Sequence, residues 1–175
     1  MRAPGELLGL RWEDVDLDTG VLRVRQSLKR SSGGLVPGAL KNEHSRRTLR
    51  MPAPVRAALA ALKREQAGDR LRLGEHHAGS GLVLADSAGR PVWPQIAQRG
   101  FQALCEQAGI GRWQLRELRH TFVSQMSAAG VDVEVIADHV GHVNSTVTRE
   151  VYSHQLADEV GTAAVVFDGL YGAGS

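Results

Sequence analysis

Residues 115–122 read LRELRHTF, and this stretch decides how the rest of the chain is interpreted. Residues three and four apart share one face of a helix, so Leu118 and Phe122 are predicted to lie on an inward apolar stripe. The same spacing places Arg116 and Arg119 together on a second stripe. Arginine is permanently charged and forks onto phosphate oxygens, so this stripe suits an anionic partner. An exposed basic helix face without a target is the alternative that these two residues leave open.

Two short segments follow, HVGH at residues 139–142 and REVY at residues 149–152. Gly141 fits the C-terminus of a helix, which would place His142 in the turn after it. Tyr152 comes ten residues later. A histidine or tyrosine alone is usually a surface or packing residue. Cations, an imidazole and a hydroxyl at short fixed spacings are the groups needed to attack a phosphodiester.

The composition is that of one soluble-type domain. The chain has 175 residues, of which 42% are hydrophobic and 23% charged, enough for a single core. Its one cysteine, Cys105, excludes an internal disulfide framework and a cysteine-based metal site, and it fits a reducing, cytoplasmic setting. No apolar run approaches the roughly 20 residues that span a bilayer, so no membrane partner is expected.

Positive charge is concentrated locally. The net charge is only +2 and the pI about 9.0, but RVRQSLKR at residues 23–30 and LKNEHSRRTLR at residues 40–50 carry many cations. Such stretches can follow the phosphates of a nucleic acid even when the net charge is small. A solvated basic face explains the same pattern equally well.

The first third of the chain predicts a small sheet. Residues 21–27 alternate between apolar and polar, and residues 35–41 and 46–52 read as two further strands. Pro37 indicates an edge or a bulge. We therefore expect a three-stranded antiparallel sheet near the N-terminus.

The remainder is predicted to be helical, with a glycine-rich connection at residues 68–81 and no internal repeat. In the helix at residues 94–109 we expect four side chains to point inward, namely Ile96, Phe101, Leu104 and Cys105. The fold class is α+β, mostly α-helical, within one domain. The expected helices cover residues 3–12, 53–67, 94–109, 116–129 and 132–140, and much of 145–167.

Taken together, five ordered segments resemble the tyrosine recombinases, also called the phage integrase family. LRELRHTF, HVGH and REVY match the family pattern of H-x-x-R-H, then G-H, then a tyrosine about ten residues later. GELLGLRWEDVDL at residues 5–17 is similar to the segment around the family's first catalytic arginine. LKNEHSRRTLRMP at residues 40–52 is similar to its β-hairpin lysine segment. The resemblance covers about residues 2–155.

This resemblance implies DNA strand transfer without a metal ion or cofactor. Tyr152 would attack a backbone phosphorus, form a 3′-phosphotyrosyl bond and free a 5′-hydroxyl. Arg119 matches the second catalytic arginine, and His142 would donate a hydrogen bond to the phosphate. Lys41 would be the general acid that protonates the departing 5′ oxygen. Two further residues, Glu6 and His120, would support the phosphate-binding side chains without contacting the phosphate themselves.

Two positions depart from the family pattern. Arg116 stands where the family usually has histidine, and an arginine cannot accept the tyrosine's proton, which leaves His142 or a water as the general base. The family also has arginine three residues before its glutamate, where this chain has Ala3. Arg2 is one position too early and serves as the first arginine only if the local helix unwinds.

The resemblance also carries expectations about context. Residues 1–175 would form a single catalytic domain without the family's N-terminal core-binding domain, as a fragment or a truncated product. Double-stranded DNA would be the partner, with self-association on DNA, as a tetramer in the family. The location would be the cytoplasm of a bacterium, at the nucleoid when bound. Type I-B topoisomerase-like cleavage and a DNA-binding remnant that no longer cleaves are the alternatives.

Overall fold

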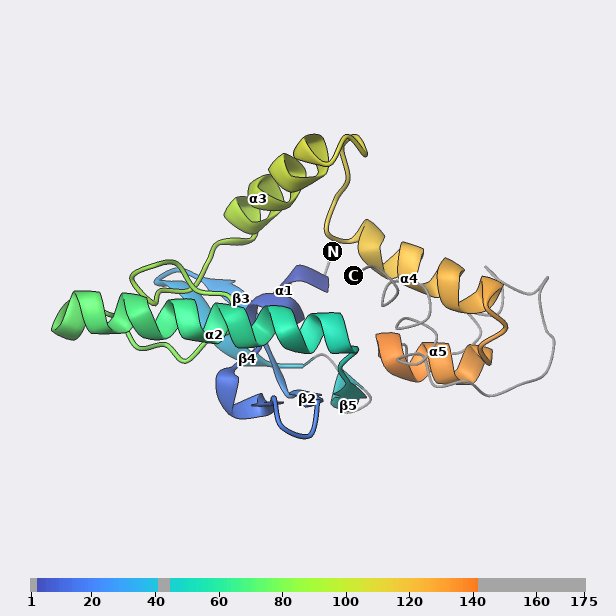
Figure 1. Cartoon of the computed structure of the whole chain (residues 1–175), viewed down its shortest axis with the longest axis horizontal. Helices are drawn as coiled ribbons and strands as arrows, with labels where there is room; N and C mark the ends of the chain where they lie inside the picture. The colour runs from blue at the N-terminus through green and yellow to red at the C-terminus, as the bar shows by residue number, and fades with distance from the viewer. Residues whose placement is uncertain (1–2, 41–44, 142–175) are drawn as a thin grey trace.

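The computed structural model describes residues 3–40 and 45–141. Its helices are α1 (Ala3–Leu8), α2 (Ala53–Leu73), α3 (Pro94–Gln107), α4 (Glu117–Ala128) and α5 (Val133–Val140). Its strands are β1 (Val15–Asp16), β2 (Val21–Val24), β3 (Gln26–Ser31), β4 (Gly34–Ala39) and β5 (Arg47–Arg50). Two short 3-10 turns are η1 (Trp12–Asp14) and η3 (Gly74–His76). Helix α2 lies along the sheet region, and the α4–α5 pair lies beyond one end of it (Figure 1).

The strands form two antiparallel sheets. One has three strands in the order β1-β2-β5, and the other is the β3–β4 hairpin. The three-stranded antiparallel sheet that the sequence predicts is present, but residues 35–41 do not belong to it. Strand β4 pairs with β3 instead, because the chain turns back between Ser31 and Gly34. Pro37 lies on this two-stranded hairpin, where a missing N–H is tolerated.

Close backbone contact joins α1 to the hairpin. A Cβ atom added at Gly9 would lie 2.9 Å from the backbone nitrogen of Leu28 and 2.9 Å from Cα of Ser27. Leu8 and Leu28 are buried in the same cluster, together with Leu82. The glycine therefore lets α1 lie directly on β3, and this contact fixes where the side chains of α1 point.

Helix α2 is longer than the sequence predicts. It continues through Gly68 to Leu73, so the first part of the expected glycine-rich connection is helical. A single glycine inside a helix costs only about 1 kcal/mol. The helix ends at Gly74, which has a φ of +53°. Its first half packs on Val15, Met51 and Val83 through a stripe of Val55, Leu59 and Leu62.

Helix α3 projects away from the rest of the described chain (Figure 1). Of the four residues expected inward, Cys105 is buried and Phe101 is half-buried. Ile96 and Leu104 are 54% and 65% exposed, so that part of the prediction is wrong. The reason is that α3 stands out from the molecule, and much of its apolar side does not reach the core.

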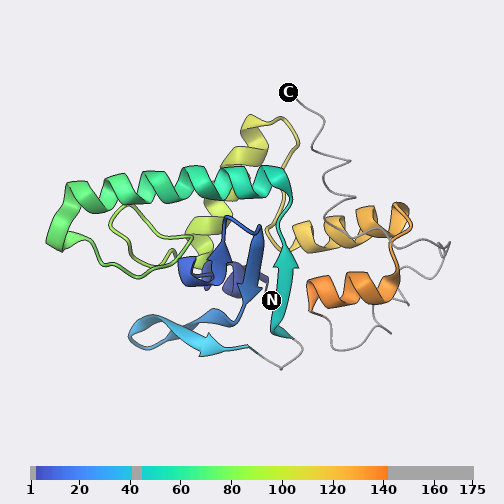
Figure 2. The ribbon, with the colours of Figure 1, turned by 60° about the horizontal axis from the view of Figure 1, so that its bottom comes forward.

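Helices α4 and α5 pack against each other, and α5 lies beside β5 (Figure 2). Val123, Met126 and Ile136 are buried between the two helices. Leu118 was predicted to be inward but is 47% exposed, because the packed stripe begins one turn later. Arg119 lies three, four and seven residues before Phe122, Val123 and Met126, so it continues this inward stripe.

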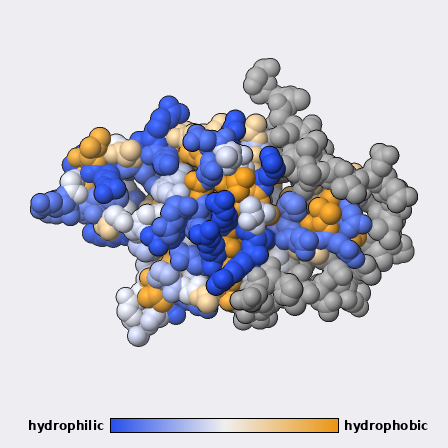
Figure 3. All heavy atoms as spheres, turned by 90° about the horizontal axis from the view of Figure 1, so that it is seen from below, coloured by the Kyte–Doolittle hydropathy of each residue, from blue (hydrophilic) through white to orange (hydrophobic). Residues whose placement is uncertain are grey.

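Seen from below, hydrophilic residues cover much of the described surface, with smaller apolar patches between them (Figure 3). In the described ranges, no helix is both long and apolar enough to cross a membrane.

Candidate functional site

The structure describes four of the eight site residues predicted from sequence. Glu6 lies on α1, Arg119 and His120 lie on α4, and Arg116 is the residue before α4. The other four lie outside the described residues, namely Arg2, Lys41, His142 and Tyr152. Of the four described, only Glu6 and Arg119 are joined by a contact that the structure records.

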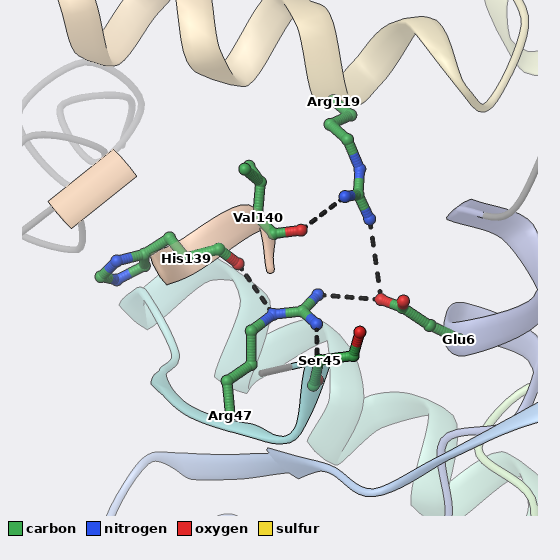
Figure 4. Close-up of polar contacts among 6 residues, drawn as sticks. All are labelled: Glu6, Ser45, Arg47, Arg119, His139 and Val140. Atoms are coloured by element: carbon green, nitrogen blue, oxygen red, sulfur yellow. Dashed lines mark hydrogen bonds and ion pairs between the residues drawn. The ribbon is translucent and has the colours of Figure 1, made fainter. Parts of the chain in front are cut away.

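One carboxylate is shared by two arginines (Figure 4). Oxygen Oε2 of Glu6 lies 3.0 Å from Nη2 of Arg47 and 3.6 Å from Nη2 of Arg119. The Glu6 side chain is only 20% exposed. A carboxylate so shielded needs compensating cations. Two guanidinium groups (+2) and one carboxylate (−1) leave the cluster with one net positive charge.

Arg47 lies at the centre of this cluster, and the sequence analysis did not single it out. Its Nε donates to the carbonyl of His139 at 2.8 Å, its Nη1 to the carbonyl of Ser45 at 3.0 Å, and its Nη2 to Glu6. One side chain on β5 therefore joins α1, α5 and the segment before its own strand.

A sequence signal for Arg47 was present. Along β5, Arg47 and Leu49 are half-buried, while Thr48 and Arg50 are exposed. This is the alternation of a strand, so an inward Leu49 implies an inward Arg47. A half-buried Glu6 also needs a cation beside it, but Glu6 and Arg47 are 41 positions apart, so the sequence does not indicate that they pair.

Arg119 reaches across from α4 to the end of α5. Its Nη1 donates to the carbonyl of Val140, and its Nη2 points toward Glu6. Burial lowers the pKa of the Arg119 guanidinium; the charge of Glu6 raises that pKa, and the charge of Arg47 lowers it. Arginine starts from so high a pKa that the group stays charged at neutral pH. The result is a fixed, partly desolvated cation.

The two arginines meet the C-terminus of α5. The last carbonyls of a helix lack partners within the helix and carry partial negative charge. Here the carbonyls of His139 and Val140 accept from Arg47 and Arg119. Gly141 then ends the helix in the left-handed region, with a φ of +68°. A Cβ atom on Gly141 would lie 2.9 Å from Nη1 of Arg47.

Arg116 and His120 have a different environment from Arg119. Both side chains are exposed, whereas Arg119 is half-buried. The predicted shared stripe of Arg116 and Arg119 therefore does not give them equivalent surroundings. Arg119 belongs to the packed side of α4, and Arg116 lies at its open N-terminal end.

A cavity of about 330 Å³ adjoins the cluster. Arg47 and Arg119 contribute to one side of it, and most of the remaining wall is apolar. An apolar wall beside Arg119 lowers the local dielectric constant and so strengthens the attraction of this cation for an anion. The lining residues are Leu22, Arg47, Leu49, Arg50, Met51, Pro52, Val55, Arg119, Phe122, His139 and Val140.

Sequence comparison identifies the group of proteins to which this arrangement belongs. The sequence model of the phage integrase family matches residues 1–159. The chain belongs to the phage integrase family. Among family relatives, an integrase of Streptomyces ambofaciens is 40% identical over 137 residues, covering 77% of this chain and 35% of that protein. The tyrosine recombinase XerC-like protein of Caldanaerobacter subterraneus subsp. tengcongensis is 23% identical, covering 95% of this chain and 46% of that protein.

Solved structures of integrases and recombinases have the same fold. The Tn1549 transposon integrase in complex with transposon right end DNA matches with a TM-score of 0.69 at 20% identity, over 97% of this chain and 54% of that chain. XerA recombinase matches with a TM-score of 0.63 at 20% identity, over 97% of this chain and 51% of that chain. The expected tyrosine recombinase catalytic-domain fold is confirmed. This phage integrase family chain spans about a third to a half of the length of the relatives named above.

Proposed function

We propose that residues 1–175 act as the catalytic domain of a site-specific tyrosine recombinase, which cuts and rejoins double-stranded DNA. The observation that carries this proposal is the fixed position of the half-buried Arg119 in the positive cluster. Arg119, in the position of the family's second arginine, is held by Glu6 and by the end of α5. In the sequence, His142 follows Gly141 at the end of α5, and Tyr152 comes ten residues after His142.

The proposed reaction is a transfer of one phosphate ester. The hydroxyl oxygen of Tyr152 forms a bond to the backbone phosphorus, and the bond from phosphorus to the 5′ oxygen breaks. Lys41 gives a proton to that 5′ oxygen, while the tyrosine proton passes to His142 or to water. A 5′-hydroxyl of a second strand reverses these steps. The number and kind of ester bonds are conserved, so no external energy source is needed.

Arg119 supplies the main electrostatic stabilisation in this scheme. The nonbridging oxygens gather negative charge in the transition state, and a preorganised cation there lowers the barrier. Arginines in comparable phosphoryl-transfer sites accelerate the reaction by roughly 10³- to 10⁵-fold. Arg116, exposed at the start of α4, would contact the phosphate from the open side. His120, exposed on the same helix, is proposed to support the site without contacting the phosphate.

The first arginine of the site is proposed to be Arg2. The register of Glu6 places Ala3 at the family position, so Arg2 must reach the phosphate from one residue further away. We propose double-stranded DNA as the partner and self-association of the chain on it. The neighbouring Tn1549 structure, an integrase in complex with DNA, supports the first of these.

Covalent capture tests the proposal. The full chain is incubated with a pool of DNA duplexes of randomised sequence, each nicked near its centre, so that cleavage beside the nick releases a short strand. We expect a protein–DNA product that survives denaturation, with the DNA attached at Tyr152, and its loss in Tyr152→Phe. At saturating DNA, Arg119→Ala should slow its formation by about 10²- to 10³-fold or more.

Arg112→Ala is the matched control, because Arg112 is exposed and pairs with Glu106 at 3.4 Å, away from the cluster. It should cleave as the unmodified chain does. If no covalent product forms, the proposal is overturned, and retained DNA binding would then identify a binding remnant. If strands are only resealed when a second 5′-hydroxyl is supplied, the topoisomerase-like alternative is favoured.

A further inference from the structure

We infer that Arg47 is a positioning residue for this strand transfer, acting on Arg119 through Glu6 and on the C-terminal end of α5 through its hydrogen bond to His139. The inference rests on the proposed function and adds to it a residue that is not among the site residues predicted from the sequence. Four observations support it: the three hydrogen bonds of the guanidinium, its burial, the charge balance at Glu6, and the close approach of Gly141.

All three nitrogens of the Arg47 guanidinium are already engaged. Nε, Nη1 and Nη2 donate to His139, Ser45 and Glu6 at 2.8, 3.0 and 3.0 Å. The acceptors come from α5, from the residue two positions earlier and from α1. A planar fork can satisfy three acceptors in fixed directions, whereas the compact ammonium of lysine cannot hold the same geometry.

Burial separates the role of Arg47 from that of a phosphate ligand. Its side chain is 14% exposed, against 26% for Arg119. Three of its five N–H groups are directed to protein oxygens. We therefore assign Arg47 an effect on the groups that hold the phosphate, and not a contact with the phosphate itself.

Charge balance explains how Arg47 affects Arg119. The Glu6 oxygen is nearer to Arg47, at 3.0 Å, than to Arg119, at 3.6 Å. With Arg47 present, the carboxylate is neutralised mainly by Arg47, and Arg119 keeps positive charge for another anion. Without Arg47, the carboxylate would close onto Arg119 and draw its guanidinium away from the place where negative charge develops on the phosphate in the transition state. Substitution of Arg47 would thus weaken the stabilisation of the transition state more than the binding of DNA.

The end of α5 provides the second route. Arg47 and Arg119 bind the carbonyls of adjacent residues, His139 and Val140. Gly141 leaves the space for the Arg47 guanidinium, because a Cβ there would lie 2.9 Å from Nη1 and 3.4 Å from Cζ. Arg47 therefore fixes the helix end from which the chain continues to His142.

The experiment measures the single-turnover rate of covalent capture at saturating DNA for Arg47→Gln, Arg47→Lys and a matched control. The control is Arg64→Gln, since the Arg64 side chain is exposed on α2 and donates to Ala60 of its own helix. Misplacing a reacting group by about 1 Å can cost on the order of 100-fold in rate. We expect Arg47→Gln to slow capture by roughly 10- to 100-fold with DNA affinity nearly unchanged, and Arg47→Lys to recover part of this loss.

Two further readouts separate positioning from a general loss of structure. The first readout uses DNA in which a methyl group replaces one nonbridging oxygen of the cleaved phosphate, which removes the charge that Arg119 neutralises. On this DNA the difference in capture rate between Arg47→Gln and the unmodified chain should be smaller. In a Glu6→Gln background, Arg47→Gln should cost less than it does alone, because its effect passes through the carboxylate. Both comparisons are ratios of rates, so a smaller folded fraction does not produce them.

The outcomes are distinct from those that test the proposed function. If the unmodified chain forms no covalent product, the proposed function fails and this inference fails with it. If the unmodified chain cleaves and Arg47→Gln cleaves equally fast, only the inference is overturned. It is also overturned if the methyl-substituted DNA leaves the full rate gap or if the Glu6 and Arg47 effects are simply additive.

Discussion

Gly141 combines two demands at one residue. It has a φ of +68°, and its missing Cβ leaves room for the Arg47 guanidinium at the end of α5. A side chain in the left-handed region costs about 1–2 kcal/mol, whatever surrounds it. At Gly141 the added methyl group would also push Arg47 away from His139 and Glu6.

Gly141→Ala should therefore lower the free energy of unfolding by about 1–2 kcal/mol and slow covalent capture further than that loss explains. The matched control is Gly109→Ala. Gly109 has the same φ of +68°, and nothing lies within 4 Å of where its Cβ would be. Urea unfolding should give a loss for both variants, larger for Gly141→Ala because the Arg47 contacts are disturbed as well, and only Gly141→Ala should slow capture. Equal capture rates for the two variants would contradict this account of the Arg47 contact.

At the scale of elements, the position of Glu6 depends on how α1 lies on β3. Gly9 is the closest point of that contact, with the backbone of Leu28 and Ser27 each 2.9 Å from where a Cβ would be. Backbone atoms cannot swing aside as a side chain does. A larger residue must move α1 as a body, and Glu6 moves with it.

Gly9→Ala should lower the free energy of unfolding by about 1–3 kcal/mol, the usual cost of forcing extra volume into a packed site. Gly68→Ala in α2 provides the opposite case, because nothing lies within 4 Å of its Cβ position. There the substitution should raise stability by up to about 1 kcal/mol, since alanine favours helix over glycine. Thermal or urea unfolding measures the change in the free energy of unfolding for each variant. A Gly9→Ala variant as stable as the unmodified chain would refute the close packing of α1 on β3.

The elements also show where sequence reasoning was sufficient. The helices α4 and α5 were predicted within a few residues because their periodic apolar positions and the Gly141 stop are local signals. The partner of β4 was not predicted correctly, because strand pairing depends on the turn between Ser31 and Gly34 and on the packing of α1. The apolar residues of α3 were misplaced for a similar reason, since periodicity finds a stripe but not what covers it.

At the scale of the whole molecule, DNA binding should depend on local cations rather than on net charge. The chain carries a net charge of only +2, so long-range attraction for DNA is weak. Each phosphate contacted should still contribute about −0.9 to the slope of log binding constant against log salt. We expect a steep linear fall in affinity as salt is raised, measured by fluorescence anisotropy with a labelled random-sequence duplex.

Arg47→Gln serves as a control in the same titration. Because its guanidinium is bonded to protein oxygens, its loss should leave the salt slope unchanged. Binding that is insensitive to salt would contradict contact with the phosphate backbone. A slope that falls by about one in Arg47→Gln would contradict the internal role of this arginine.

The site was only partly predictable from the sequence for a reason of scale. Glu6 and Arg119 fall in short motifs, so their types and spacings point to them directly. Arg47 acts through contacts 41 and 92 positions away in the sequence, and neither spacing is a local pattern. The strand alternation indicates that Arg47 points inward, but only the three-dimensional structure shows which oxygens accept its hydrogen bonds.

These long spans have a consequence for the newly made protein. Arg47 leaves the ribosome well before its acceptor at His139, which is translated 92 residues later. Until the last turn of α5 has emerged and docked, Arg47 and Arg119 lack the carbonyls of His139 and Val140 to which they donate. A nascent chain that ends before α5 therefore cannot form the cluster that joins Arg47 and Arg119 to the carbonyls of His139 and Val140.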